Sequence, residues 1–411
     1  MAGQQIFDVT VIGAGPAGLI AAAACARSGL DTLLIGPPAN SEDRRTSALF
    51  GGSIELLKKL DVWPELRDRS EPIGGIRIVD GSTSLFRAPE VLFEAREAGF
   101  EAFGYNIPNM ALTKALEAVC GPSMTRVPTG VTSVKIGADE VELTVAGDGV
   151  FHARLAVAAD GRASATRAAA GIEVSSWTYP QSAIITMFHH QRRHRDISTE
   201  LHRPAGPLTV VPGPGLTSHL VWIDSREEVE RLMGLDDAAF GRELGQALQG
   251  LLGSLSNFSP RQSFPLSGQT ARSLAKNRVV VAGEAAHVIP PIGAQGLNLS
   301  CRDAATLAEI ASDAKRSGAD IGGEETLSRY ESARRADIGT RVFAVDLLNR
   351  SLLSSYIPGV SLARGLGLFA LASSPALRSR VMREGILPAA SNPLMMSAEE
   401  ISPPRLDEQT R

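Results

Sequence analysis

The sequence predicts an α/β protein in which a doubly wound nucleotide-binding sheet is interwoven with a second sheet. The first observation is that Phe7 to Ile12 has the pattern of a buried strand, Pro16 to Arg27 that of an alanine-rich helix, and Thr32 to Ile35 that of another strand. Strand, glycine turn, helix and strand in about 30 residues typically begin a dinucleotide-binding fold. The second observation is a group of strand-like runs between Gln181 and Pro265. They predict a sheet that covers the nucleotide-binding part.

The remaining elements follow from apolar periodicity and from turn residues. Helices are expected over Gly52 to Lys59, Ala111 to Val119, Leu297 to Ser312 and Glu324 to Leu353, with another near Glu227 to Leu252. Two strands are expected within Val131 to Val145, another over Phe151 to Ala158, and others over Ala183 to Phe188, Leu208 to Val211 and His219 to Ile223.

We expect the chain to pass between the two parts of the molecule. Residues 1–180 and 266–340 are predicted to form the nucleotide-binding part, and residues 181–265 the second sheet. Residues 341–394 are predicted to be a C-terminal helical segment, and residues 395–411 a disordered tail because they combine prolines with scattered charges.

Composition excludes several classes of protein. The 411 residues are 44% hydrophobic, enough for a sizeable core, and the net charge of −4 gives no indication of nucleic-acid binding. Cys25, Cys120 and Cys301 are far apart and odd in number, so neither a disulfide framework nor a metal site is expected. Without a signal peptide or a bilayer-spanning apolar run, we expect a cytoplasmic protein.

A glycine turn follows the first strand. Gly13 suits the tight turn, Gly15 the close approach of a pyrophosphate, and Gly18 the contact between helix and strand. Pro16 and Ala17 open the helix, whose free N–H groups and dipole bind phosphate. The spacing therefore predicts a dinucleotide site.

One position departs from the usual pattern of such sites. Gly36 stands at the end of the second strand, where dinucleotide folds usually place an acid for the adenosine ribose. The nearest acids, Glu42 and Asp43, lie in the following loop. Either one of them reaches back, or backbone and water hold the ribose.

A second segment, Gly283 to Asn298, indicates which dinucleotide is bound. An apolar strand delivers the carboxylate of Glu284, which suits the hydroxyls of a ribityl chain, and a loop with Pro290 and Pro291 leads to a helix start. The positive N-terminus of that helix would stabilise an anionic reduced flavin ring. The candidate binding residues here are Glu284, Pro291, Gly293, Gln295, Gly296, Leu297 and Asn298. His287 is either catalytic or, as we favour, packed behind the site.

Together, Gly13 to Gly18 and Gly283 to Asn298 resemble the FAD-dependent aromatic-ring hydroxylases, or class A flavin monooxygenases, and among them the ubiquinone-biosynthesis hydroxylase family. The resemblance extends over about residues 7 to 390. It implies a Rossmann-like FAD-binding domain interwoven with a β-sheet substrate domain. It also implies that NADH or NADPH reduces FAD, after which O₂ is used to hydroxylate an aromatic ring. FAD is expected to be non-covalent, because no cysteine or histidine stands in an attachment motif.

Two shorter motifs support the same resemblance. Asp43 to Leu49 is similar to a family pattern whose arginine approaches the pyrophosphate and the flavin edge, which implies that role for Arg45. The alternative is a solvated basic pair, Arg44 and Arg45. Asp160 and Gly161 are similar to the family's second fingerprint, which implies a turn over the flavin on the route of the pyridine nucleotide. Asp160 could cap a helix and also take part in this turn over the flavin, because the two roles are compatible.

The resemblance further implies a polyprenylated phenol or quinol substrate from ubiquinone biosynthesis, with no catalytic residue assigned. The apolar segment Tyr356 to Ser373, with Arg364, Arg378, Arg380 and Arg383 in or behind it, either rests on a membrane surface or forms a buried helix pair.

Three rival functions remain open. They are hydroxylation of a small soluble phenol, a flavin halogenase, and a non-catalytic flavoprotein within a ubiquinone-biosynthesis complex. The halogenase is disfavoured because Trp63, Trp177 and Trp222 are isolated. The other histidines carry little: His189 and His190 should point to opposite faces of a strand, and His194 and His202 are expected on the surface.

Overall fold

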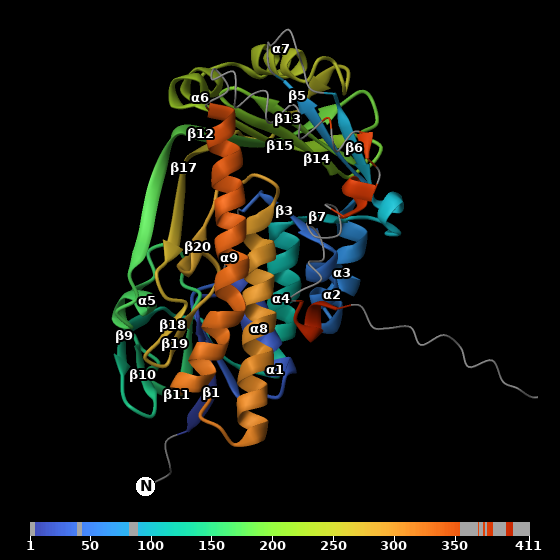
Figure 1. The fold of residues 1–411 in the computed structure, drawn as a ribbon. Coiled ribbons are helices and arrows are strands. Elements are labelled where there is room, and N and C mark those ends of the chain that lie inside the picture. The colour runs from blue at the N-terminus through green and yellow to red at the C-terminus, as the bar shows by residue number, and fades with distance from the viewer. Residues whose placement is uncertain are drawn as a thin grey trace, which may run out of the picture.

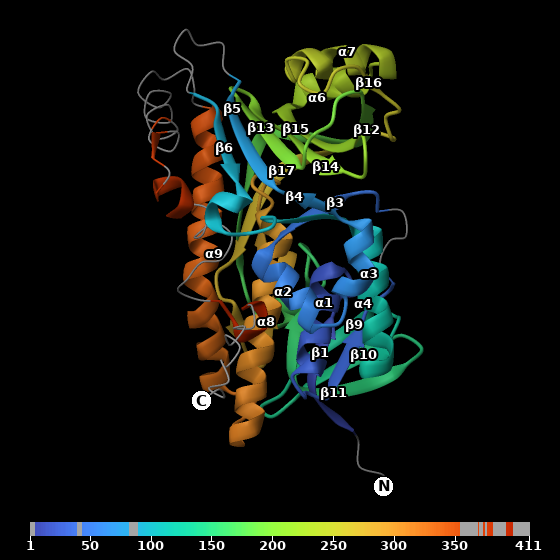
Figure 2. The same ribbon diagram turned by 90° about the vertical axis from the view of Figure 1, so that its right-hand side faces the viewer.

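The computed structural model describes residues 5–38, 43–81, 89–353, 369, 373–374, 376–380 and 392–397. Within them, two large sheets are joined by long helices, and a small third sheet lies between the two (Figures 1 and 2). The apolar segment expected over Tyr356 to Ser373 lies almost wholly outside the described residues, as do Arg364 and Arg383.

The first sheet has a parallel core made of predicted strands. β1 (Ile6–Ile12) pairs with β2 (Thr32–Ile35) and with β11 (Gly149–Ala158), and β11 pairs with β19 (Val279–Val281). Ile12 lies beside Ile35 and Ala158, so the carboxyl ends of these strands meet at one edge. The other strands of this sheet are β8 (Thr125–Val127), β9 (Val131–Ile136), β10 (Val141–Val145) and β18 (Ala275–Lys276).

Alanine determines how closely the helices approach this sheet. In α1 (Pro16–Arg27) every residue from Gly18 to Cys25 is buried, and the small side chains let the helix pack against both α4 (Asn109–Ser123) and α8 (Gln295–Ser317). α9 (Glu324–Leu353) lies beside α8 and reaches the second sheet (Figure 1). Shorter helices are α2 (Gly51–Lys59), α3 (Trp63–Leu66) and α5 (Ala165–Ala169), and the 3₁₀ turns are Arg67–Arg69, Ala95–Ala98, Gly283–Ala285 and Leu394–Met396.

The second sheet is mostly antiparallel. Its order is β20 (His287–Val288), β17 (Gln262–Ala271), β12 (Val174–His190), β15 (Thr217–Ser225), β14 (Gly206–Gly213), β13 (Ile197–Arg203), β5 (Gly75–Asp80) and β6 (Val91–Glu94), with β16 (Leu255–Ser256) on β12. One face packs against α6 (Arg226–Met233) and α7 (Asp237–Ala247). On the opposite face, Ile223 packs with Ile292 of the loop before α8, so this face is turned toward the first domain.

The small sheet joins the two domains. It contains β3 (Thr46–Phe50), β7 (Gly104–Pro108) and β4 (Glu71–Ile73). Asn106 of β7 donates a hydrogen bond from Nδ2 to the carbonyl of Pro212 at the end of β14, at 2.8 Å. The small sheet is therefore tied directly to the second sheet.

The structure differs from one sequence prediction in the second domain. The single helix expected near Glu227 to Leu252 is two helices, because Gly234 ends α6. Ser225 caps α6 and Asp236 caps α7. In each case the side-chain oxygen accepts a hydrogen bond from a backbone N–H of the first turn. Two caps within this short stretch favour two helix starts over one continuous helix.

Several of the predicted segment boundaries fall inside secondary-structure elements. β12 runs across the boundary at 180/181, and α9 runs unbroken across 340/341. β5 and β6 join the second sheet although they lie far N-terminal to residue 181. Met396, which the sequence assigned to the tail, is buried among residues of the large core. The segment boundaries remain predictions.

Candidate active site

The predicted motifs lie at the carboxyl edge of the first sheet. β1 leads into Gly13, β2 into Gly36, β11 into Asp160 and β19 into Glu284. Because these four strands are parallel neighbours, the four positions come together at one edge. Open α/β sheets bind their ligands at this edge.

The glycine turn is fixed by backbone contacts. A Cβ on Gly18 would lie 1.9 Å from the carbonyl oxygen of Gly13, and one on Gly13 would lie 2.2 Å from that of Ala159. A Cβ on Gly15 would meet no atom within 4 Å. α1 starts here with Pro16 and without a side-chain cap, so the space above Gly15 faces free N–H groups. This turn fits a pyrophosphate.

The position of the missing ribose-binding acid is sterically closed. A Cβ on Gly36 would lie 2.8 Å from the backbone nitrogen of Ala14. Asp43 is already engaged: burial raises the pKa of its carboxyl, but hydrogen bonds from Arg45 and Asn109 outweigh this and bring it to about 2. Glu42 lies outside the described residues. The ribose is therefore predicted to be bound either by Glu42 or by backbone groups and water.

Arg45 is held by Asp43 and lies near Glu284. Its Nε and a terminal nitrogen donate to the two carboxylate oxygens of Asp43, both at 2.8 Å. Asp43 and, more weakly, the charge of Glu284 raise the pKa of Arg45. The Arg45 side chain is 57% exposed and Glu284 is exposed as well. Both residues are thus available at one surface, and their contact with a flavin remains a prediction.

The start of α8 is an open helix N-terminus. Ala294 precedes it with a φ of 53°, and no side chain caps the 23-residue helix. Pro291, Gly293 and Gly296 are exposed beside it, and Leu297 is half-buried. The free N–H groups and the helix dipole therefore face an uncovered surface, which suits the electron-rich end of a reduced flavin.

Asn298 has a structural role at this helix start. Its Oδ1 accepts from the backbone N–H of Phe50 at 3.0 Å and from Oγ of Ser53 at 2.7 Å. Its Nδ2 donates to the carbonyls of Ala48 at 2.8 Å and Ala294 at 2.7 Å. These four bonds use both donors and both acceptor directions of the amide. Asn298 therefore clamps β3 and α2 to α8.

Gln295 is also held from behind. Its Oε1 accepts from Arg341 of α9 at 2.5 Å, and its Nε2 donates to the carbonyl of Gly293 at 2.9 Å. Arg341 is in turn bonded to Asp337 at 2.8 Å. The loop at Gly293 is thus tied through one amide to a salt bridge on α9.

Asp160 supports the start of α5, whose N-cap residue is Ser164. One carboxylate oxygen accepts from Oγ of Ser164, and the other from the backbone N–H and hydroxyl of Thr166 at 3.1 and 3.0 Å. Gly161 has a φ of 86°, which favours glycine. Arg167 donates to the carbonyl of Ala285 at 3.0 Å, so this turn is tied to the Glu284 loop. Asp160 thus supports the first turn of α5, but the N-cap residue is Ser164, and contact with the flavin stays a prediction.

A buried ion network, missed by sequence analysis, supports the Glu284 loop. Asp303 of α8 accepts from the backbone N–H of Gly283 at 3.1 Å, bonds His287 Nε2 at 2.7 Å, and pairs with Arg334 of α9 at 2.8 Å. Burial raises the pKa of Asp303, but His287 and Arg334 outweigh it and leave the pKa below its usual value. His287 therefore packs behind the site, as expected. The only sequence signal for Asp303 was a charge at a core-facing helix position.

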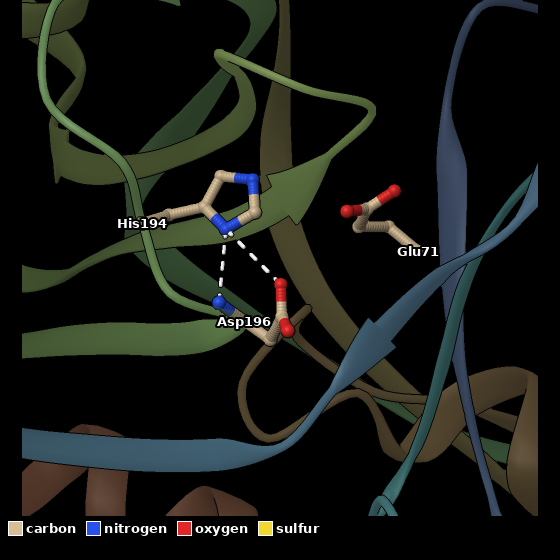
Figure 3. Close-up of side chains that lie close together, drawn as sticks. All are labelled: Glu71, His194 and Asp196. Atoms are coloured by element: carbon tan, nitrogen blue, oxygen red, sulfur yellow. Dashed lines mark hydrogen bonds and ion pairs between the residues drawn. The ribbon is translucent and has the colours of Figure 1, made fainter.

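Two histidines expected on the surface are in fact covered. His202 is 5% exposed and bonds Glu200 at 2.7 Å. The side chain of His194 is 7% exposed and lies beside Asp196 and Glu71 (Figure 3). Its Nε2 donates to the carbonyl of Gly213 at 2.9 Å, and its Nδ1 accepts from the backbone N–H of Asp196 at 3.0 Å. With both nitrogens used, the cluster is a hydrogen-bonded corner and gives no support for a metal site.

Comparison with known proteins identifies the cofactor for which this edge is built. A family model described as "FAD binding domain" matches residues 7–344. Ubiquinone hydroxylase UbiL of Rhodospirillum rubrum is 34% identical over 392 residues, covering 93% of this chain and 90% of the relative. The chain belongs to the FAD-dependent ubiquinone-biosynthesis hydroxylase family. It is a flavin-dependent monooxygenase, with FAD as cofactor and NAD(P)H as the electron donor typical of the family.

Other relatives have similar extents. The 3-demethoxyubiquinol 3-hydroxylase of Escherichia coli is 28% identical, covering 92% of this chain and 98% of the relative. Human ubiquinone biosynthesis monooxygenase COQ6 is also 28% identical, with 92% of each chain covered. Among solved structures, p-nitrophenol 4-monooxygenase PnpA of Pseudomonas putida superimposes with a TM-score of 0.75 at 17% identity, covering 93% of this chain and 98% of that chain. That likeness confirms the fold of a FAD-dependent monooxygenase.

Proposed function

We propose that this monooxygenase hydroxylates the ring of a polyprenylated phenol or quinol precursor of ubiquinone, using O₂ and NADH or NADPH. The relatives that cover nearly its whole length carry names from ubiquinone biosynthesis, which supports the proposal. Bound FAD would supply the redox chemistry and the activation of O₂. The protein's residues bind the cofactor and substrate, orient them and exclude water.

The structural observation that carries the proposal is the apolar contact between the flavin loop and the second sheet. Ile292 of this loop packs with Tyr179, Ala183 and Ile223 of the second sheet. Val345 of α9 belongs to the same buried cluster. Because these side chains pack on one another, they exclude water beside the flavin loop, and the exclusion of water strengthens every electrostatic contact there. A ring with an apolar chain would suit such a water-free border.

FAD would be held by three kinds of group. The turn from Gly13 to Gly18 offers backbone N–H groups to the pyrophosphate, Glu284 offers a carboxylate to the ribityl hydroxyls, and the start of α8 offers a positive helix end to the ring. Asp43 aims the guanidinium of Arg45 at the same surface. Asp160 and Gly161 would form the turn on the side where the pyridine nucleotide arrives.

We also propose peripheral contact with the membrane that holds such a substrate. No helix among the described residues is long and apolar enough to cross a bilayer. Phe343 and Leu347 of α9 are 67% and 55% exposed, which supports an apolar contact surface near the end of that helix. Arg380 belongs to the predicted basic set, whereas Arg378 already pairs with Glu97 at 3.2 Å.

Co-sedimentation with anionic vesicles tests this contact. The bound fraction should fall as salt is added, and it should fall in a variant carrying Arg364, Arg378, Arg380 and Arg383 as glutamine. Equal partitioning of the two proteins at all salt concentrations would contradict this contact.

Two measurements test the substrate. Deletion of the gene should cause accumulation of a ubiquinone precursor that lacks one ring hydroxyl, identified by mass spectrometry of the quinone pool. The purified enzyme should consume NAD(P)H faster with a short-chain prenylated phenol than with the unprenylated phenol. Faster turnover with the unprenylated phenol, and an unchanged quinone pool, would instead support the hydroxylation of a small soluble phenol.

A further inference from the structure

His219 lies on the face of the second sheet that is turned toward the flavin domain. Along β15, Leu220 and Trp222 pack against α6 and α7 on one face. Val221 and Ile223 point the other way and belong with the cluster around Ile292. Because side chains alternate along a strand, His219 shares the face of Val221 and Ile223.

The neighbours of His219 connect it to the start of α8. A Cβ on Gly213 would lie 3.2 Å from Cδ2 and 3.3 Å from Nε2 of His219, so the ring stands directly beside the end of β14. The carbonyl of the preceding Pro212 accepts from Asn106 at 2.8 Å. Asn106 pairs with Ala48, whose carbonyl is bonded by Asn298 at the first turn of α8. The ring thus lies on the second sheet, beside the point where the small sheet is bonded to β14.

His219 has unused hydrogen-bonding capacity. His190, His194, His202 and His287 each bond a neighbour. No described residue bonds a ring nitrogen of His219, which is half-buried. Burial lowers the pKa of His219 to about 4, so the ring is neutral at pH 7 and one nitrogen carries a free lone pair.

The charged groups around Gly213 leave the ring of His219 neutral. The carbonyl of Gly213 is bonded by His194, which lies beside Asp196 and Glu71 of β4 (Figure 3). Both nitrogens of His194 are engaged, and burial is the cause of the lowered pKa of His219. A proton acceptor without a partner among the described residues is therefore present on the sheet face that is turned toward the first domain.

We propose that His219 accepts the proton of the ring hydroxyl of the substrate during hydroxylation. The oxygen comes from O₂ that the electrons of NAD(P)H have reduced to the peroxide level. When one peroxide oxygen bonds to a ring carbon, ring π electrons form the new C–O bond, the O–O bond breaks, and the other oxygen leaves with that electron pair and ends as water. A lone pair of the existing hydroxyl then forms a C=O bond, and the lone pair of His219 takes the hydroxyl proton. The ring becomes aromatic again when the carbon that received oxygen loses its C–H proton to solvent and the C=O oxygen regains a proton, and the imidazolium gives up its proton as the product departs. This inference rests on the proposed phenol or quinol substrate.

The test compares wild type, His219→Gln and a control, His189→Gln, which changes an exposed histidine on the neighbouring strand β12. The probes are an ortho-prenylated phenol and its difluoro derivative, whose hydroxyl is already ionised at weakly alkaline pH. FAD content and the Kd of each phenol should change less than about threefold in His219→Gln. With the neutral phenol, the single-turnover rate of product formation should fall about 10²-fold, the usual effect of losing a general base. It should rise again with pH, whereas with the ionised phenol the loss should disappear.

Equal rates for His219→Gln and His189→Gln would overturn the inference while leaving the proposed function intact. An equal loss with both phenols would also overturn it, because that result indicates a structural role. A second readout does not require turnover: in protein labelled with ¹⁵N-histidine, the prenylated phenol should shift the ring nitrogens of His219. Binding without that shift would contradict the inference alone. A wild type that neither binds nor hydroxylates the phenol would contradict both proposals.

Discussion

The two halves of the flavin site are held in place by different forces. At the turn from Gly13 to Gly18, backbone packs on backbone, so closely that a single Cβ on Gly18 would lie 1.9 Å from a carbonyl oxygen. The segment from Gly283 to Asn298 is instead supported by buried side-chain ions. Asp303 bonds this loop and pairs with Arg334, with 2.8 Å between the Arg334 Nε and the Asp303 carboxylate. The first half should therefore respond to side-chain size, and the second to charge.

The largest effect is expected from Gly18→Glu. Its side chain has no room beside Gly13 and would place an anion at the pyrophosphate, so the protein should lose FAD and melt at a lower temperature. The ratio of flavin to protein absorbance and thermal unfolding measure both. Gly15→Ala is the control: its Cβ meets nothing within 4 Å, so the fold should be kept even where FAD binds more weakly. Stoichiometric FAD in Gly18→Glu would contradict the role of this turn in binding FAD.

Asp303→Asn should break the second half through charge alone. Arg334 would remain buried with Asp337, at 2.7 Å, as its remaining ion partner. Breaking a buried pair completely costs about 3–5 kcal/mol, so the loss should approach but not exceed that range. Asp313→Asn changes an acid on the same helix that is 38% exposed and should cost less than about 0.5 kcal/mol. Urea unfolding measures both variants. Similar losses in the two would mean that the ion network does not support the loop.

The same carboxylate should make stability depend on pH. Burial raises the pKa of Asp303, but His287 and Arg334 together lower it below the usual value. A carboxyl whose pKa is lowered on folding stabilises the protein above its unfolded pKa of about 3.9, and this contribution is lost as pH falls through the folded pKa. Below about pH 4, wild type should therefore lose more unfolding free energy per pH unit than Asp303→Asn. Parallel acid-unfolding curves would argue against this linkage.

Glu284→Ala should have an intermediate effect that is confined to the cofactor. Losing a hydrogen bond to a charged group costs about 1.5–3 kcal/mol, so FAD should bind one to two decades more weakly, with Glu284→Asp much nearer wild type. Arg45→Ala should weaken FAD less and slow reduction by NAD(P)H. Flavin titrations and stopped-flow reduction separate these effects. No loss of affinity in Glu284→Ala would leave this carboxylate without a ribityl role.

The smallest effect is expected from Arg341→Gln, which releases the amide of Gln295 from α9. Gly293 would keep its hydrogen bond from Gln295, so only the orientation of the loop is loosened. FAD should bind about three- to tenfold more weakly, a fraction of one charged hydrogen bond. Arg329→Gln changes an exposed arginine on the same helix and should leave the affinity unchanged. A loss as large as that of Glu284→Ala would place Arg341 in direct contact with the flavin.

Local patterns predicted the first domain well because its elements form from nearby residues. The strand at Thr32–Ile35 and the helices Pro16–Arg27 and Glu324–Leu353 have the bounds that the apolar periodicity indicated. The helix near Glu227 was wrong in one respect, since Gly234 and Asp236 divide it. His194 and His202 were placed on the surface because arginines surround them in sequence. Strand pairing buries His202, and the loop between β12 and β13 brings His194 against the carbonyl of Gly213.

By itself, the sequence determined the turn from Gly13 to Gly18, the carboxylate at Glu284 and the helix start before Asn298, because spacing along the chain fixes such features. Only the tertiary structure decided that Asn298 is a clamp, that Asp303 and Arg334 meet beneath the Glu284 loop, and that His219 faces the flavin domain. These depend on which residues pack together from α8, α9 and β15. Pairing across such distances is set by the folding of the whole chain, and no local period records it.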